Sequence, residues 1–198
     1  MRKAFAAAAL LLATTGLASP ALLAEPAKKE DLMVAPAGAR HYTITSSGGK
    51  HGDIWQWTLP DGRLAYRMSM NLRGWITETD ETITLAPDGT AKKIAIRGFT
   101  DSGDATEDYW DDDQGVAHWK TSVDEGSAPV GAKSYSTYGG PWLAGEQDLD
   151  RLIAAGDKGV ETLPSGRAYI SIGQPVEITG PNGTETVKLA FVRGQGFS

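Results

Sequence analysis

The chain has 198 residues, no cysteine and a formal net charge of −6. This length suits one domain with a small extension and is too short for a complete (β/α)8 barrel, which takes roughly 200–250 residues or more. Without cysteine there are no disulfides, thiolate zinc sites, iron–sulfur clusters or cysteine nucleophile. The acidic charge, with no cluster of Lys and Arg, argues against nucleic acid or an anionic membrane as a partner.

The first 24 residues have the order of regions found in secretory signal peptides. Residues 1–3 carry two basic side chains, residues 4–13 are apolar, and small residues follow up to Ala24. The apolar run, about 10 residues, is too short for a transmembrane helix, which needs about 20. We expect cleavage after Ala24, with cleavage after Ala18 as the alternative. Because no cysteine follows for lipid attachment, the leader predicts a soluble periplasmic or secreted protein without a transmembrane segment.

Residues 25–40 are polar and rich in proline and alanine, which is typical of a linker. From residue 41 to 145 short runs alternate between apolar and polar side chains, which predicts β-strands. Aspartate–glycine pairs interrupt these runs and favour tight hairpins. We therefore expect an antiparallel β-meander, curved like a half-barrel or packed like a sandwich. The predicted turns are Pro60-Asp61-Gly62, Pro87-Asp88-Gly89 and Asp113-Gln114-Gly115.

Residues 146–198 are expected to form a short helix and a C-terminal segment of three strands. Residues 126–145 show no periodicity. The run 147–155 then places apolar side chains at helical spacing, and Gly156 follows where a glycine ends a helix. Strands are predicted at 168–172, 176–179 and 186–192, with a turn at Pro181-Asn182-Gly183. The predicted fold is thus mainly β with one helix.

Three histidines, His41, His51 and His118, are the candidate metal ligands. No two have the spacing of a His-x-His or His-Glu-x-x-His motif, and zinc sites need three or four converging ligands. Surface or strand-face histidines are therefore the better interpretation.

The stretch 101–113 is rich in Asp and Glu, but it fails the pattern of a calcium-binding EF-hand loop. Counted from Asp111, position 5 is Gly115 and position 12 is Ser122, where oxygen ligands including a glutamate are required. Ser47-Gly48-Gly49-Lys50 matches the Ser-x-x-Lys motif of penicillin-binding enzymes, but two glycines disfavour the helix that this chemistry needs. We expect no catalytic, cofactor-binding or metal-binding residue in this chain.

Aromatic residues are the remaining signal. Trp55, Trp57, Tyr66 and Met68 are expected to share one face of a hairpin, where they could bind an apolar ligand. The simpler interpretation is that they fill the core, because large side chains dominate protein interiors.

Several segments resemble the N-terminal region of exported, metal-dependent amidohydrolases of proteobacteria, which are imidazolonepropionase-like. The resemblance is carried by residues 163–168 (LPSGRA), 176–178 and 189–197, together with Arg73-Gly74 and residues 115–120. It implies an accessory β-meander followed by the first strands of a small sandwich beside a catalytic barrel. In that family the metal ligands come from a His-x-His strand and from later His and Asp residues of the barrel. None of those positions exists here.

Three hypotheses follow. The first is a non-catalytic accessory β-domain of a periplasmic amidohydrolase, with the barrel in the same chain or in a partner, so that the reading frame either continues beyond Ser198 or encodes a free-standing domain. The second is a stand-alone periplasmic carrier of an apolar small molecule, with the helix 147–155 covering the aromatic face. The third is a small hydrolase with an unrecognised site.

Overall fold

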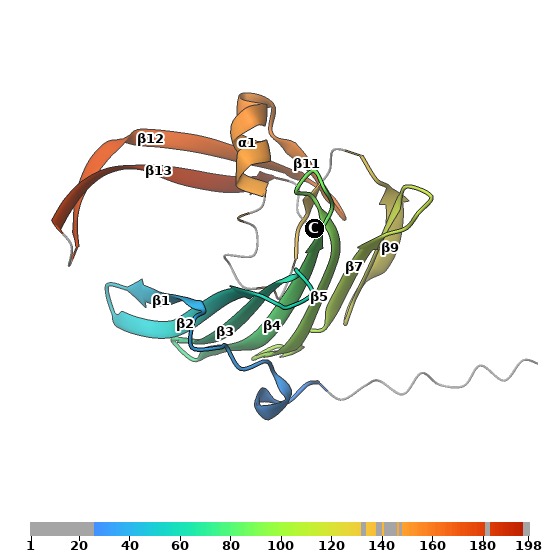
Figure 1. Cartoon of the computed structure of the whole chain (residues 1–198), viewed down its shortest axis with the longest axis horizontal. Helices are drawn as coiled ribbons and strands as arrows, with labels where there is room; N and C mark the ends of the chain where they lie inside the picture. Colours follow the sequence, from blue (N-terminus) through green and yellow to red (C-terminus); the bar gives the residue numbers. More distant parts are fainter. Residues whose placement is uncertain are drawn as a thin grey trace, which may run out of the picture.

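The protein is mainly β, as predicted: two sheets, one helix and a long C-terminal hairpin are shown in Figure 1. The large sheet is a curved antiparallel meander, and the small sheet lies against its concave side. The computed structural model describes residues 26–131, 134–137, 140, 146, 148–180 and 183–195.

The large sheet follows the chain almost without interruption, in the order β1-β2-β3-β4-β5-β7-β8-β9, with β6 paired to the end of β5. Its neighbouring strands are antiparallel, which confirms the predicted meander. The strands are β1 (Arg40–Ser46), β2 (Gly49–Thr58), β3 (Leu64–Leu72), β4 (Trp75–Leu85), β5 (Ala91–Thr100), β6 (Gly103–Asp104), β7 (Glu107–Asp111), β8 (Val116–Thr121) and β9 (Glu125–Pro129).

The three predicted aspartate–glycine turns join β2 to β3, β4 to β5 and β7 to β8. All three have the same hydrogen bonds, such as Leu59 N–H to the Arg63 carbonyl and Gly62 N–H to the Leu59 carbonyl. This is a three-residue loop in which the glycine takes a positive φ, +88° at Gly62. The local sequence therefore decides three of the reversals in the large sheet.

The small sheet has the order β10-β11-β12-β13, with β10 parallel to β11 and the other pairs antiparallel. The sequence predicted two strands within what is one long strand, β12, and it missed β9, β10 and β11. The strands are β10 (Ser134–Tyr135), β11 (Val160–Leu163), β12 (Arg167–Gly180) and β13 (Gly183–Gln195); the helices are α1 (Leu149–Ala155) and the 3₁₀ turns η1 (Lys29–Asp31) and η3 (Gly156–Lys158).

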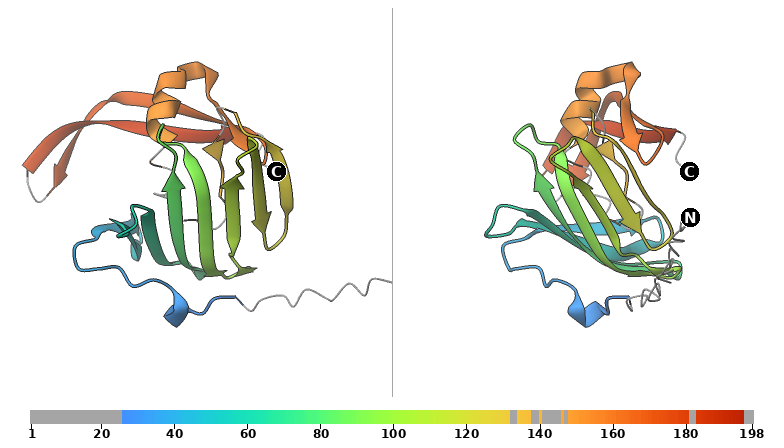
Figure 2. Two further views of the ribbon diagram at one scale, coloured as in Figure 1. Left: turned by 45° about the vertical axis from the view of Figure 1, so that its right-hand side comes forward. Right: turned by 90° about the vertical axis from the view of Figure 1, so that its right-hand side faces the viewer.

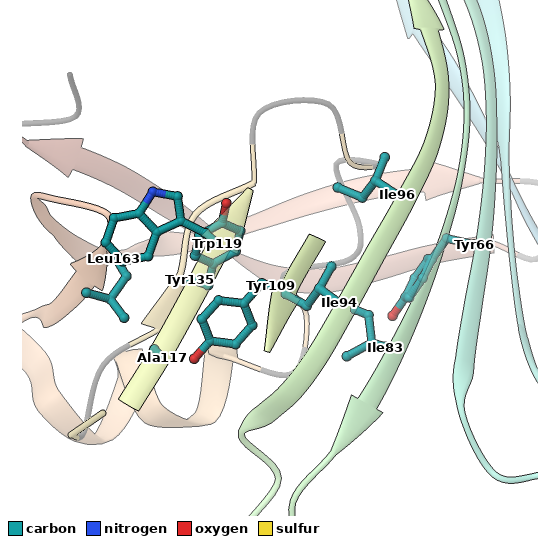
Figure 3. Packing of buried hydrophobic residues seen from close by; sticks show 9 residues of the cluster. All are labelled: Tyr66, Ile83, Ile94, Ile96, Tyr109, Ala117, Trp119, Tyr135 and Leu163. Atoms are coloured by element: carbon teal, nitrogen blue, oxygen red, sulfur yellow. The ribbon is translucent and has the colours of Figure 1, made fainter. Parts of the chain in front are cut away.

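The main core lies on the concave face of the large sheet. Tyr135 and Leu163 from the small sheet pack there against side chains of β3, β4, β5, β7 and β8, as Figure 3 shows. The rings of Tyr109 and Tyr135 stack at 4.5 Å between centroids. The core members from the large sheet are Tyr66, Ile83, Ile94, Ile96, Tyr109, Ala117 and Trp119.

The aromatic residues predicted to share one face do not do so. Gln56 pairs with Tyr66, and Trp55 pairs with Arg67, so the two tryptophans of β2 lie on the convex face. Tyr66 and Met68 lie on the concave face, each within a buried cluster. The reason is the loop length: a three-residue loop shifts the pairing by one position relative to a two-residue turn, and one position exchanges the faces.

The N-terminal strap, residues 26–36, lies along the convex face of the large sheet (Figure 1). These residues fall within the predicted linker. Leu32 is only 4% exposed. The Met33 backbone N–H donates to Asp80 at 2.7 Å, and the Lys29 ammonium pairs with Glu78. The strap therefore covers carboxylates that point away from the main core.

The helix α1 confirms the predicted helix over its described residues and ends at Gly156, as predicted. Leu152 packs with Val160 of β11 and Ile170 of β12, which fixes the helix on the small sheet. Ile153, one of the apolar residues at helical spacing, is 56% exposed. The helix therefore lies at the base of the β12–β13 hairpin and does not cover the convex face that carries Trp55 and Trp57.

Candidate functional site

The three histidines lie in separate places, each with its own partner. His41 Nε2 lies 2.6 Å from Asp53 Oδ1, and the His41 ring stacks on Trp55. His51 Nε2 lies 2.6 Å from the Ser46 hydroxyl. These contacts involve a pair of neighbouring strands in each case, and the structure does not bring the three histidines together.

The third histidine, His118, contacts Asp112 at 3.0 Å and stacks on Trp110. Asp112 also accepts backbone N–H bonds from Gln114 and Val116, so it closes the β7–β8 turn. Across residues 101–113 the acidic side chains alternate between the faces of β7 or occupy turns. In the described part of the chain no group of three or more His, Cys, Asp or Glu residues is arranged to hold a metal ion.

The Ser-x-x-Lys motif lies in the β1–β2 hairpin. Ser47 and Gly48 form the turn, and Lys50 already lies in β2, where its ammonium is 2.7 Å from Asp53 Oδ1. A strand places alternate side chains on opposite faces, so serine and lysine do not align as they would on a helix. The motif therefore supplies no nucleophile.

Two glutamates of the concave face are buried in the main core. Glu81 on β4 and Glu107 on β7 are both paired in register with Ile96 on β5, so a single strand separates them. Adjacent strands lie about 4.8 Å apart, which places their backbones roughly 10 Å from each other. The Tyr135 hydroxyl donates a hydrogen bond of 2.6 Å to Glu107 Oε1.

Glu81 is the chemically unusual member of this pair. Both its carboxyl oxygens are buried, and neither has a hydrogen-bond partner among the described residues. Burial, followed by the nearby charge of Glu107, raises the pKa of Glu81 to about 8. Burial also raises the pKa of its cross-strand neighbour Tyr66 to about 12. The side chain of Glu81 is fully buried, so no substrate reaches it. We therefore interpret Glu81 as an energetically unfavourable buried group of the core.

A second polar cluster binds the strap to the convex face. Glu78 accepts hydrogen bonds from Lys29, Arg67 and Ser69. Burial raises the pKa of Glu78, but the hydrogen bonds from Lys29 and Arg67 outweigh this effect and hold the pKa below its usual value. Asp80 receives a two-point contact from Arg97, at 3.1 Å and 2.6 Å. Every group here has a structural partner, so the cluster stabilises the fold.

The β12–β13 hairpin is the feature that the core does not explain. We call residues 169–180 and 183–194 the arm. It projects away from the rest of the protein, past β1, in Figures 1 and 2. Among the described residues β11 pairs with β12 only at Arg167 and Ala168, which leaves the edge of β12 without a partner strand from Tyr169 onward. In the described part of the chain β13 pairs with β12 alone, which leaves its outer edge free as well.

The arm is strongly amphipathic in its outer half. The pairing register places Lys188, Glu177, Thr186 and the hydrogen-bonded pair Thr179 and Thr184 on one face. The opposite face is mainly apolar, with Glu185 beside Ile178 as an acidic member, and its apolar side chains remain solvent-accessible: Val176 is 39% exposed, Ile178 49%, Leu189 47% and Phe191 54%. An apolar face on a two-stranded ribbon is not buried by the ribbon itself.

The base of the arm borders a separate pocket. A pocket of about 450 Å³ lies between α1 and β12, and it is lined by Ile153, Tyr169, Ile172 and Arg193 among others. Two of these side chains, Ile153 and Ile172, are at least half exposed. Ile170 and Ile172 lie opposite Val192 and Ala190, so α1 packs on the face of the arm that carries Lys188 and not on the face of Leu189 and Phe191. The sequence predicted the strands of the arm, but it missed their length and their isolation, which pairing partners decide.

No helix in the described part of the chain is long and apolar enough to cross a membrane. No family model matches the chain, and the comparisons with curated proteins and with solved structures found no match either.

Proposed function

We propose that this chain is a non-catalytic accessory β-domain that docks to a partner domain through its arm. The observation that carries the proposal is the isolated two-stranded arm with one exposed apolar face. A two-stranded hairpin is at best marginally stable in water and gains stability when a third strand or another apolar layer covers it. Free strand edges of this length also bind further strands readily.

The apolar face of the arm can contribute substantially to such docking. Complete burial of a Val, Leu, Ile or Phe side chain stabilises by about 1.5–3 kcal/mol. Four side chains that are each about half exposed therefore hold roughly 4 kcal/mol of unrealised hydrophobic stabilisation. Hydrogen bonds along the free edges add to this amount and fix the register of the partner.

The partner we propose is the catalytic barrel of a metal-dependent amidohydrolase, in the same chain or in a second one. The sequence resemblance of residues 163–168 and 176–178 to the leading region of those enzymes supports it. The form of the arm supports this partner as well. The arm is one layer with an uncovered face, and a sandwich beside a barrel would supply the second layer. The absence of a hydrolytic constellation among the described residues fits a role in docking.

The alternative function, a carrier of an apolar ligand, rested on four residues that were expected to share one face. Its four residues are divided between the two faces of the large sheet, two on each. Tyr66 and Met68 are covered completely by other core residues. We therefore favour the docking role.

We propose that the protein acts in the periplasm or is secreted. The basic, apolar and small-residue order of residues 1–24 supports this location, and these residues lie outside the described part of the chain. The acidic net charge supports a role away from nucleic acid.

Photo-crosslinking in the native cell tests the docking role. A photoreactive phenylalanine analogue replaces Phe191 on the apolar face of the arm, and cross-linked peptides are identified by mass spectrometry. The proposal predicts cross-links to an amidohydrolase barrel that carries a His-x-His strand. The matched control replaces Trp110, which is 38% exposed on the convex face.

Two results would overturn the proposal. One is a cross-linking yield at Phe191 no higher than at Trp110. The other is cross-linking at Phe191 only to proteins that lack an amidohydrolase barrel. Amide hydrolysis by the purified chain that a chelator abolishes would also contradict the non-catalytic role.

A further inference from the structure

A pocket of about 310 Å³ opens at one end of the large sheet, remote from the arm. It lies where β4 begins, β5 ends and β7 begins, beside the end of β8. Its volume is at the lower end of the range of small-molecule sites, roughly 300–1,000 Å³. The pocket therefore suits one small ligand or one unit of a longer chain.

The wall of the pocket carries an exposed indole. Trp75 follows the tight turn at Arg73 and Gly74, and it is 63% exposed. Large aromatic side chains are usually covered, and an exposed one beside a pocket provides a flat apolar platform with a polar N–H edge. Val123, which is 84% exposed, lines the pocket as well.

Polar side chains of the concave face contribute to the lining of the pocket. Thr77 pairs in register with Thr100, and Glu107 pairs with Thr121, so two cross-strand polar pairs lie side by side there. Glu107 is 1% exposed and held by the Tyr135 hydroxyl. Glu107 therefore supports the inner side of the pocket and is not itself exposed to a ligand.

The rim adds further hydrogen-bonding groups. Hydroxyl side chains supply half of the twelve residues that line the pocket, and none of the twelve is basic. The Asp104 Oδ1 atom accepts hydrogen bonds from Thr106, while Ser122 donates to the Asp104 carbonyl. The lining thus combines the apolar surface of Trp75 and Val123 with hydroxyl and carboxylate groups, a combination that matches the apolar ring face and the hydroxyl groups of a sugar.

We propose that this pocket binds a neutral sugar, with the pyranose ring stacked on Trp75 and its hydroxyl groups directed toward the Thr77 and Asp104 side. The excess of hydroxyl over carboxylate side chains favours a polyol over an organic cation. The site is separate from the arm, so its occupation does not depend on the docking role.

Titration of the isotope-labelled protein with D-glucose, D-galactose and N-acetyl-D-glucosamine, followed by NMR, tests this site. Saturable shifts of the Trp75 indole N–H signal are expected for at least one sugar. Trp75→Ala should weaken binding by about tenfold or more, which corresponds to about 1.4 kcal/mol. Trp110→Ala, on the opposite face, should leave the affinity unchanged.

Three results would overturn the sugar site. They are the absence of saturable shifts with all three sugars, equal affinity in Trp75→Ala and the unmodified protein, and saturation by choline in place of the sugars. Because Trp75 is mostly exposed, its replacement should not unfold the protein, and circular dichroism of the variant checks this.

Discussion

Replacement of Glu81 by glutamine should stabilise the protein, and the gain should grow with pH. The pKa of Glu81 rises from 4.5 to about 8 in the folded state, with burial as the first cause. Between about pH 4.5 and pH 8, Glu81 of the folded protein therefore keeps a proton that the same residue of the unfolded chain has already released. The stabilising contribution of this proton is complete below about pH 4.5 and is lost progressively as the pH rises toward 8.

The magnitude follows from the size of the shift. Each pKa unit corresponds to 1.36 kcal/mol, so at pH 7 the carboxyl group destabilises the fold by about 3 kcal/mol relative to a side chain that does not titrate. Glutamine has the same shape and remains neutral. The difference in unfolding free energy between Glu81→Gln and the unmodified protein should therefore widen by about 2 kcal/mol between pH 6 and pH 8.

Urea unfolding followed by tryptophan fluorescence measures this difference at each pH. Glu125→Gln, at an exposed position at the start of β9, is the matched control and should follow the unmodified protein at every pH. Parallel pH profiles for Glu81→Gln and the unmodified protein would refute the reasoning, because they would show that Glu81 ionises as freely in the fold as in the unfolded chain.

Three further outcomes are expected. Leu32→Ala should lower the unfolding free energy by about 2 kcal/mol in urea titrations because it removes the buried anchor of the strap, while Val34→Ala, at a position 90% exposed, should leave it nearly unchanged. Gly98→Ala should prevent stable folding, as judged by thermal melting, because its Cβ would lie 2.0 Å from a carbonyl oxygen of β4, whereas Gly38→Ala meets no atom within 4 Å and should melt normally. Phe191→Ser should leave the melting temperature nearly unchanged because this side chain is 54% exposed, and a large drop in melting temperature would show that the arm is already packed.

The turns and the alternation of side chains were sufficient to predict the meander. Each Pro-Asp-Gly or Asp-Gln-Gly turn reverses the chain where expected, and the apolar residues of β3 and β5 lie inside. The face of β2 was predicted wrongly because the register between β2 and β3 depends on the length of the loop, and only a two-residue turn would have paired Trp57 with Tyr66. The loop has three residues, and this single position moves Trp55 and Trp57 to the convex face.

The missed strands have a common cause. Residues 125–129 contain small residues and a proline, and only pairing with β8 makes them a strand. Residues 173–175 (GQP) indicated a break, but β12 accommodates them with a bulge opposite β13. Proline is tolerated at such a position because bulges and free edges need no ladder donor there. The local sequence pattern therefore predicts where the chain reverses better than it predicts which strands pair with each other.

The buried pair Glu81 and Glu107 shows the same limit. In sequence, Glu81 lies among polar residues of a strand whose charged neighbours Glu78 and Asp80 have cationic partners. Only the register across β3, β4, β5 and β7 places Glu81 in the core without one. The arm was likewise recognisable as strands. Its isolation could not be predicted, because it depends on how the other strands of the protein pair with one another.

Amide hydrogen exchange of the arm is the most direct test of the docking surface. In the purified protein, confirmed as a monomer by native mass spectrometry, the amides along the free edges of β12 and β13 should exchange much faster than those of β3, β4 and β5, because no partner strand protects them. Arm amides protected as strongly as those central strands in the monomer would show that the arm is already covered, and would contradict the account.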